Sequence, residues 1–319
     1  MAFSVGTLVD YVKEFESGLV TSSLFGAKTQ ELIVREGNVK LGVKSSETID
    51  IMDTDAYFQS DSSCGFNASG TTTFTQRTVT VGKMKLNEDL CLKTLEAKAT
   101  QKLLPTGSDY DSIPFEQAYT ERKAGKIAEA LEVGLWQNDT SAAAGTNGLT
   151  NKFDGLIKLM NVASGSTIFA NTTGYLTTVV TAFTTSNILD AVDATCRAIP
   201  ARVKGKPDVR VFIGWDLYEL YVQGLKNQNL FNFGAPGVGE GEINIPGFGY
   251  RLTAVHGLDS QNRIVALRMS NLHLGVDMQN EEEEFKLWYS MDDDVVKFKA
   301  RFKMGINFAF PEEITIFKL

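Results

Sequence analysis

The sequence has few of the residues that most enzymes use for acid–base chemistry. It contains only two histidines, His256 and His273, among 319 residues. A Ser/His/Asp or Cys/His arrangement would need one of them, with its partners within hydrogen-bond reach. Neither lies in a recognisable motif, and His273 is flanked by apolar residues in the run SNLHLGVD. We therefore expect structural histidines, no catalytic residues and no cofactor, so the protein is predicted not to be an enzyme.

Cysteine is also scarce, and the three cysteines, Cys64, Cys91 and Cys196, are far apart. Because an odd number cannot form a complete disulfide set, we interpret them as reduced thiols of a protein made in a cytoplasm. The N-terminal residues MAFSVGTLVDYVKEF contain no basic segment followed by an apolar one, so no signal peptide is expected. No apolar run reaches the roughly 18 residues of a membrane span, so no membrane partner is expected.

Metal and nucleotide motifs are missing from the sequence as well. The dense acidic clusters, 281–284 and 292–294, flank an apolar strand and are typical of solvated turns. A cation held between subunits is the alternative for these carboxylates. The glycine-rich stretch 233–249 does not fit the dinucleotide fingerprint, since Glu242 stands where the third glycine is required and no helical pattern follows. A surface loop is the better interpretation, and no metal ligand is proposed.

The overall charge is acidic. There are 39 acidic and 31 basic side chains, which give a net charge of −8 and a pI near 5.0. Binding of duplex DNA through its phosphates requires a basic face. The balance therefore argues against a dedicated nucleic-acid reader, although non-specific contact with DNA is compatible with it.

Two segments are present that have too little core of their own. Residues 4–20 place Leu8, Tyr11, Val12, Phe15 and Leu19 on one stripe of a helix that has nothing sequential to pack on. The tract 59–81 is rich in Ser, Thr and Gly, and its second half alternates like a strand. It predicts a long, exposed two-stranded ribbon, which needs a partner surface because a lone hairpin is unstable in water. For the helix, docking on its own domain is the alternative.

The remaining patterns predict a mixture of helices and strands. A long helix is expected over about 113–138, where Pro114 follows Ser112 and apolar residues recur at helical spacing. The other predicted elements are extended segments within 29–60, a short helix at 87–104, helices at 186–199 and 217–225, and strands at 209–214 and within 250–277. The fold class is therefore α+β.

The last segment alternates most clearly. From Val296 to Phe310 every second residue is apolar, while Lys297, Lys299, Arg301 and Lys303 occupy positions between them. This predicts a half-buried strand of about 15 residues, paired with 285–290, which is far longer than the usual five or six. The basic stripe is expected to pair with acidic groups of a neighbouring chain or to lie in solvent, with DNA contact as the alternative.

The segments 53–81, 114–139 and 271–314, the last containing NLHLGVD and FKMGINFAFP, carry a resemblance to a known family. Their order resembles the major capsid proteins of tailed phages with the Hong Kong 97-like fold, over nearly the whole chain. The resemblance implies four parts: an N-terminal arm (1–44), an extended β-hairpin loop or E-loop (45–85), a peripheral or P-domain with a long spine helix (86–150 and 281–319), and an axial or A-domain (151–280).

The same resemblance implies a structural function, namely self-assembly into the hexamers and pentamers of an icosahedral phage head that encloses double-stranded DNA. The expected partners are further copies of the chain, a portal protein, a separate scaffolding protein, and decoration or head–tail connector proteins. Packaged double-stranded DNA is expected in non-specific contact only. The expected location is the capsid of the virion, assembled in the cytoplasm of the bacterial host.

Two alternatives remain open at this point. An encapsulin-type nanocompartment shell uses the same fold to enclose protein cargo. A hydrolase or nucleotide-binding enzyme is the second alternative, against which the scarcity of histidine and the unsuitable glycine motif both count. The Lys–Asn isopeptide cross-link of the family's best-known member cannot be mapped onto this sequence by motif, so no residues are assigned to it.

Overall fold

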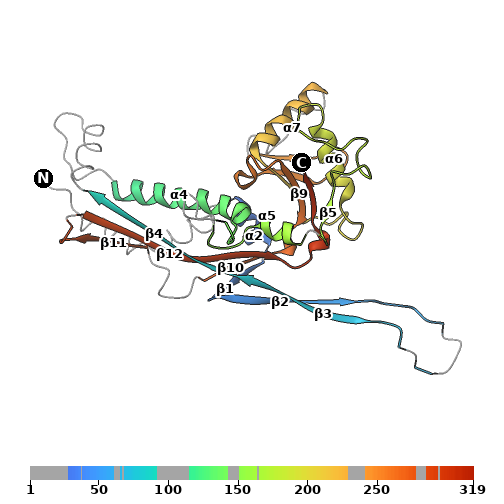
Figure 1. The fold of residues 1–319 in the computed structure, drawn as a ribbon, viewed down its shortest axis with the longest axis horizontal. Coiled ribbons are helices and arrows are strands. Elements are labelled where there is room, and N and C mark those ends of the chain that lie inside the picture. Colours follow the sequence, from blue (N-terminus) through green and yellow to red (C-terminus); the bar gives the residue numbers. More distant parts are fainter. Residues whose placement is uncertain are drawn as a thin grey trace.

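The computed structural model describes residues 28–36, 38–60, 65–66, 68–91, 115–142, 151–163, 165–228, 241–277, 285–293 and 295–319. These residues form a five-stranded sheet, a six-stranded sheet and a two-stranded ribbon. Figure 1 shows an elongated molecule, in which the ribbon extends from one side and the six-stranded sheet forms a compact unit above the long sheet. The predicted helix at 4–20 and residues 92–104 of the predicted helix at 87–104 lie outside the described residues, as do residues 233–240 of the glycine-rich stretch.

The five-stranded sheet is built around one very long strand, β12 (Val295–Phe308). One edge of β12 pairs with β4 (Gly82–Cys91), and the other pairs with β11 (Phe285–Ser290) and then β10 (Leu272–Val276), all antiparallel. A short strand, β1 (Val39–Leu41), adds to β10 in parallel. Even-numbered residues of β12 such as Phe298 and Phe302 are buried in the main core. The predicted long closing strand and its hairpin partner are therefore confirmed.

The long helix α4 (Phe115–Gln137) lies along this sheet, as Figure 1 shows, and confirms the helix predicted at about 113–138. Its buried residues, among them Leu131, Leu135 and Trp136, belong to the same hydrophobic core as the even-numbered residues of β12. A second helix, α5 (Leu156–Val162), contacts α4 and β12. Burial of this apolar face, more than helix propensity, stabilises a helix of this length.

The helix α2 (Lys28–Glu36) is joined to α4 by a buried polar contact. The Glu132 carboxylate on α4 accepts hydrogen bonds from the backbone N–H of Thr29, at 3.0 Å, and from its hydroxyl. The indole N–H of Trp136 donates to the same hydroxyl oxygen at 3.0 Å. Because an anion near the first turn of a helix satisfies its free N–H groups, Glu132 fixes the start of α2 on α4.

The six-stranded sheet has the strand order β5-β13-β9-β6-β8-β7. Its strands are β5 (Ile168–Phe169), β6 (Val209–Ile213), β7 (Glu242–Asn244), β8 (Arg251–Ala254), β9 (Arg263–Arg268) and β13 (Thr315–Lys318). The helices α6 (Ile188–Ala198) and α7 (Trp215–Asn227) join Val211 and Ile213 of β6 in one hydrophobic cluster. Phe212 points to the other face and joins the main core, so this sheet is covered on both sides.

Short 3₁₀ turns complete the body: η3 (His256–Leu258), η4 (Met269–Asn271) and η5 (Pro311–Glu313). The helices predicted at 186–199 and 217–225 and the strand predicted at 209–214 are confirmed. The strand pairings differ from the expected domain ranges in two places, because β10 belongs to the long sheet and β13 to the six-stranded sheet. The division into arm, E-loop, P-domain and A-domain therefore stays a prediction.

Two expected elements are wrong. The segment 28–36 was expected to be extended, but it forms α2, in which Leu32 and Ile33 are buried and Arg35 pairs with Glu31 one turn away. The helix expected at 87–104 is wrong over 87–91, where β4 continues to pair with β12. In both cases a short apolar run fits either period, and tertiary packing decides between them.

Candidate assembly surfaces

The β2–β3 ribbon is anchored at its base and projects beyond it. The strands β2 (Ser46–Thr54) and β3 (Thr72–Thr80) are antiparallel, with Ser46 opposite Thr80 and Thr54 opposite Thr72. The predicted two-stranded ribbon is present, but only its second strand lies in the tract 59–81, because the first strand lies wholly before it. At the base, Ile49, Ile51 and Val79 are buried in a small cluster with Ala309.

Two contacts with the end of β12 hold this base in place. The side-chain amide of Asn307 donates to the backbone oxygen of Thr78 at 2.6 Å. The guanidinium of Arg77 lies over the Phe308 ring, 4.6 Å from its centroid. Burial of the Arg77 guanidinium lowers its pKa from the usual value. The base is therefore part of the folded body.

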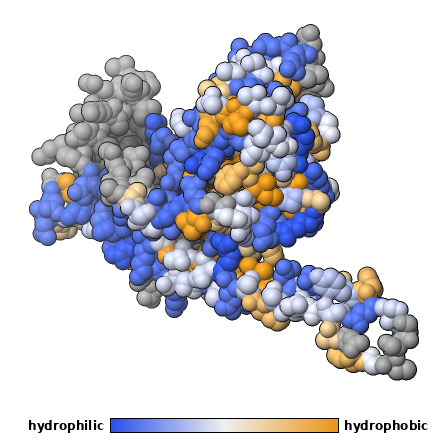
Figure 2. Space-filling model, turned by 45° about the vertical axis from the view of Figure 1, so that its right-hand side comes forward, coloured by the Kyte–Doolittle hydropathy of each residue, from blue (hydrophilic) through white to orange (hydrophobic). Residues whose placement is uncertain are grey.

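The distal half of the ribbon has large apolar side chains that no described part of the chain covers. Met52 and Phe74 stand opposite each other and are 61% and 77% exposed. Beyond the strands, Phe58 and Phe66 are 102% and 94% exposed. Figure 2 shows apolar residues at the far end of the ribbon. Soluble monomers rarely expose such groups together, so this distal ribbon (Met52–Phe74) is a candidate contact surface.

The distal ribbon is also uniformly acidic. Between Met52 and Phe74 the sequence contains Asp53, Asp55 and Asp61 but no lysine or arginine. Gln76 donates its side-chain amide to Asp50 at 2.8 Å, and the hydroxyls of Thr54 and Thr72 are 3.0 Å apart. These cross-strand contacts hold the two strands together, but each leaves the apolar side chains in solvent.

A basic face lies on the opposite side of the long sheet from α4. The pairing of β4 with β12 puts Lys83 opposite Lys303 and Lys85 opposite Arg301, while the alternate residues Met84 and Phe302 are buried in the main core. Together with Lys297 and Lys299 these cations form the basic face. Sequence analysis predicted its β12 half; the β4 half depends on strand register.

Two of these cations are paired within the chain. Lys303 donates to Asp277 at 2.8 Å, and both side chains are buried, with the second oxygen of Asp277 unbonded. Lys297 pairs with Asp293, which raises the pKa of the lysine and lowers that of the carboxyl. Lys83, Lys85, Lys299 and Arg301 have no ion-pair partner in the part of the chain that the structure describes.

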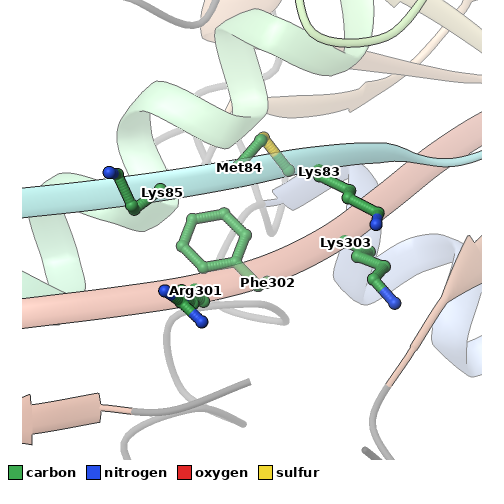
Figure 3. A pocket seen from close by; sticks show the side chains of 6 residues that line it. All are labelled: Lys83, Met84, Lys85, Arg301, Phe302 and Lys303. Atoms are coloured by element: carbon green, nitrogen blue, oxygen red, sulfur yellow. The ribbon is translucent and has the colours of Figure 1, made fainter. Parts of the chain in front are cut away.

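A pocket opens on the basic face, and its lining is mainly cationic. Figure 3 shows the six residues that line it: Lys83, Met84, Lys85, Arg301, Phe302 and Lys303. Its lining contains no carboxylate, thiol, hydroxyl or imidazole that could act together with a lysine amine in acid–base or nucleophilic chemistry. What it can do is attract anionic groups of a partner.

The two histidines lie apart from this pocket. His256 is exposed, stacks on Trp215 at 5.6 Å, and has its Nδ1 atom 2.9 Å from Asp259. His273 is half-buried on β10, opposite Asn307, and burial lowers its pKa, with a smaller effect from Lys40. Neither is near a cysteine or a catalytic constellation in the described ranges. Cys196 is a free, buried thiol whose pKa burial raises to about 12.

The predicted acidic turns are only partly described. Asp293 lies in the β11–β12 turn, where Ser290 also donates to its carboxylate, as expected for a solvated turn. Residues 281–284 and Asp294 lie outside the described residues. Among the residues with described placement, no group of three or more His, Cys, Asp or Glu side chains could hold a metal ion. In the same residues no helix is long and apolar enough to span a membrane.

No family model and no curated protein matches the sequence. Solved structures do match: a chain of the "Satellite phage P4 procapsid including size determination (Sid) protein" has a TM-score of 0.56 at 11% identity, covering 96% of this chain and 99% of that chain. A chain of the "Capsid of native GTA particle" has a TM-score of 0.57 at 14% identity, covering 90% of each. A third, from a "virus-like particle from Pyrococcus furiosus", has a TM-score of 0.53 at 13% identity, covering 97% of this chain and all of that one (100%).

These likenesses extend over nearly the whole chain and concern shell proteins in each case. At identities this low they show the fold. The chain therefore has the mixed helix-and-sheet fold of phage capsid proteins, and the resemblance predicted from the sequence is confirmed.

Proposed function

We propose that this chain is the major capsid protein of a tailed phage, a structural subunit that assembles into hexamers and pentamers of an icosahedral head around double-stranded DNA. The observation that carries the proposal is the distal ribbon, whose aromatic side chains no described part of its own chain covers. Copies of the same chain are the natural partner, because the capsid structures that share this fold are built from repeated chains.

In this proposal the parts of the molecule have the roles that the family resemblance implies. The β2–β3 ribbon is the E-loop, the long sheet with α4 is the P-domain with its spine helix, and the six-stranded sheet is the A-domain. The N-terminal arm is the range 1–44, which includes α2 and β1. The strand pairing supports moving two segments relative to the expected ranges: β10 to the P-domain and β13 to the A-domain.

Assembly follows from burying the distal ribbon on a neighbouring copy. Covering Met52, Phe58, Phe66 and Phe74 removes apolar area from water, worth roughly 25 cal/mol per Å² buried. The acid-only charge of the distal ribbon is complementary to Lys83, Lys85, Lys299 and Arg301 of the basic face, for which the described residues provide no ion-pair partner. Figure 1 shows the ribbon extending away from the part of the sheet formed by β11 and β12, so such a contact joins two copies. Repeated over a closed shell, modest contacts give a stable particle.

The other expected partners are a portal protein, a scaffolding protein, and decoration or connector proteins. Packaged DNA is contacted without sequence preference, in line with the net charge of −8. The particle forms in the cytoplasm of the bacterial host and becomes part of the virion. An encapsulin-type shell is the alternative, and the contents of purified particles discriminate: nucleic acid in a phage head, a cargo protein in an encapsulin.

The test shortens the ribbon without touching its base. Replacing Met52–Phe74 by Asn-Gly joins Ile51 to Thr75, which are already paired, through a turn suited to a hairpin. The shortened chain should melt at the wild-type temperature, because the buried base is intact, but should form no shells in electron micrographs. A second variant, Met52→Ser with Phe74→Ser, keeps the ribbon length but removes two exposed apolar side chains. It should therefore assemble less well than the wild type. Shells of normal size from the shortened chain would refute the proposal.

A further inference from the structure

The two sheets are connected by two segments that run side by side. In the six-stranded sheet, β9 pairs with β13 as far as Ala266 and Thr315. In the long sheet the same two stretches of chain pair again, starting at Leu272 and Phe308. Between these pairings the antiparallel ladder is interrupted, over 267–271 on one side and 309–314 on the other. This interruption, which contains η4 and η5, is the joint between the two sheets.

The side chain of Asn271 replaces the missing ladder bonds at the joint. It is 3% exposed. Its Oδ1 atom accepts hydrogen bonds from the backbone N–H groups of Ala309, at 3.0 Å, and Phe310, at 2.7 Å, and its Nδ2 atom donates to the backbone oxygen of Phe310 at 2.7 Å. The backbone oxygen of Asn271 also accepts from Ala309 at 3.1 Å. Since buried peptide groups need partners, this amide fixes how the second segment passes the first.

Charged side chains fix the other side of the joint. The Arg268 guanidinium lies 3.1 Å from the Asp208 carboxylate and 3.4 Å from that of Glu313, which lies in η5. The hydroxyl of Ser270 donates to Asp208 as well. These contacts therefore help to hold the two connecting segments, 267–271 and 309–314, in one conformation between the sheets.

A separate contact holds the sheets together at α4. The Trp136 ring packs on Phe212 of β6, with centroids 5.4 Å apart, and the side-chain amide of Gln137 donates to the backbone oxygen of Gly257 at 2.8 Å. This contact keeps the two sheets packed whatever happens at Asn271. Both sheets also contribute residues to the main hydrophobic core, so the joint acts on the relative orientation of two sheets that stay packed together.

We propose that Asn271 is a positioning residue that fixes the angle between the two sheets, and through that angle the curvature at which copies of the chain meet. The inference rests on the proposed shell function. A shell closes only if every subunit presents its contact surfaces in the same relative orientation, because repeated contacts close or fail to close according to the rotation between neighbours. If the angle at the joint varied from one subunit to the next, neighbouring subunits would meet at different angles and shells of different curvature would form.

The test uses Asn271→Asp, which keeps the size and the acceptor but loses the donor to Phe310 and places a carboxylate against that carbonyl oxygen. The matched control is Asn171→Asp. Asn171 also makes three backbone hydrogen bonds, at 2.9 Å from Val180 N, 2.9 Å to Val180 O and 2.8 Å to Lys318 O. All of these lie within the unit formed by the six-stranded sheet, so this control loses the same kind of contact away from the joint.

Two measurements separate positioning from general stability. Both variants should lower the melting temperature. In electron micrographs, only Asn271→Asp should lose the single diameter class of wild-type shells. In unassembled chains, spin labels at Lys85→Cys on β4 and Glu219→Cys on α7, in a background with Cys64 and Cys91 replaced by serine, should give a broader distance distribution only in Asn271→Asp. Cys196 is buried and stays unlabelled.

The outcomes are distinct. Wild-type diameters and an unchanged distance distribution in Asn271→Asp would overturn the inference, as would equal broadening in Asn171→Asp. If Asn271→Asp is insoluble, Asn271→Ser retains one hydroxyl for the same backbone groups and serves in both measurements. If the wild-type chain forms no shells, the proposed function fails, while the distance measurement still tests the joint by itself.

Discussion

The six-stranded sheet and the β2–β3 ribbon are both held by backbone hydrogen bonds between strands. They differ in burial, because β6 of the sheet is fully buried and most residues of the ribbon are exposed. All five residues of β6 are buried, with α6 and α7 on one face and the main core on the other. In β2 only Ile49 and Ile51 are buried, and both lie at the base. In the described residues β6 pairs with a strand on each side, whereas β2 and β3 pair only with each other, so the ribbon has both less ladder pairing and less apolar cover. The compact sheet is covered within its own chain, whereas the described residues leave the distal ribbon uncovered.

The largest expected effect contrasts two phenylalanines. Phe212→Ala removes a fully buried ring that packs on Trp136, and should lower the free energy of unfolding by about 3–5 kcal/mol. Phe74→Ala, at an exposed ribbon position, should change it by less than about 0.5 kcal/mol. Chemical denaturation of unassembled chains measures both values. A loss for Phe74→Ala close to that for Phe212→Ala would show that the ribbon already packs within its own chain.

A second contrast compares ion pairs. Asp277→Asn removes the buried carboxylate that pairs with the buried Lys303 and should cost about 3 kcal/mol. At the ribbon, Glu47→Gln removes the partner of Lys40 in a pair that is well exposed, and should cost less than about 1 kcal/mol. The same denaturation experiment serves, repeated at high salt, where only the exposed pair should weaken further. Equal losses of unfolding free energy for Asp277→Asn and Glu47→Gln would contradict the proposed difference between the two regions.

The smallest expected effect is a dependence on pH that originates in the compact part. Burial raises the pKa of Glu132, against the hydrogen bonds from Thr29, which lower it. A carboxyl whose pKa is raised on folding contributes its full stability at low pH and loses it as the pH rises through the raised value. Glu132→Gln should therefore gain stability relative to the wild type as the pH rises over the range above the ordinary carboxyl pKa. A constant difference in melting temperature over that range would contradict this.

The sequence allowed prediction of elements whose pattern is long. The alternation from Val296 to Phe310 and the apolar spacing along 113–138 extend over many residues, so periodicity identifies β12 and α4. The helix α2 and the end of β4 were missed because ELIV (31–34) and the leucines near 90–95 are too short or too evenly spaced to fix a period. Their conformations are decided by α4 and β12, which are distant in the sequence.

The candidate surfaces were predictable to different degrees. The ribbon was expected from its composition, and the β12 half of the basic face from the spacing of its lysines. Its other half, Lys83 and Lys85, depends on register with β12, which no local pattern specifies. The role of Asn271 was not predictable, because a single asparagine has no pattern and its bonds reach residues 38 and 39 positions away.

Hydrogen exchange on the unassembled chain and on assembled shells tests the central claim most directly. Amides of β6 and β9 should be protected in both samples, since both strands are covered within one chain. Amides of Ile51–Thr54 and Thr72–Thr75 should exchange rapidly in the unassembled chain and become protected in shells. Equal and strong protection of these ribbon amides in the unassembled chain would contradict the account.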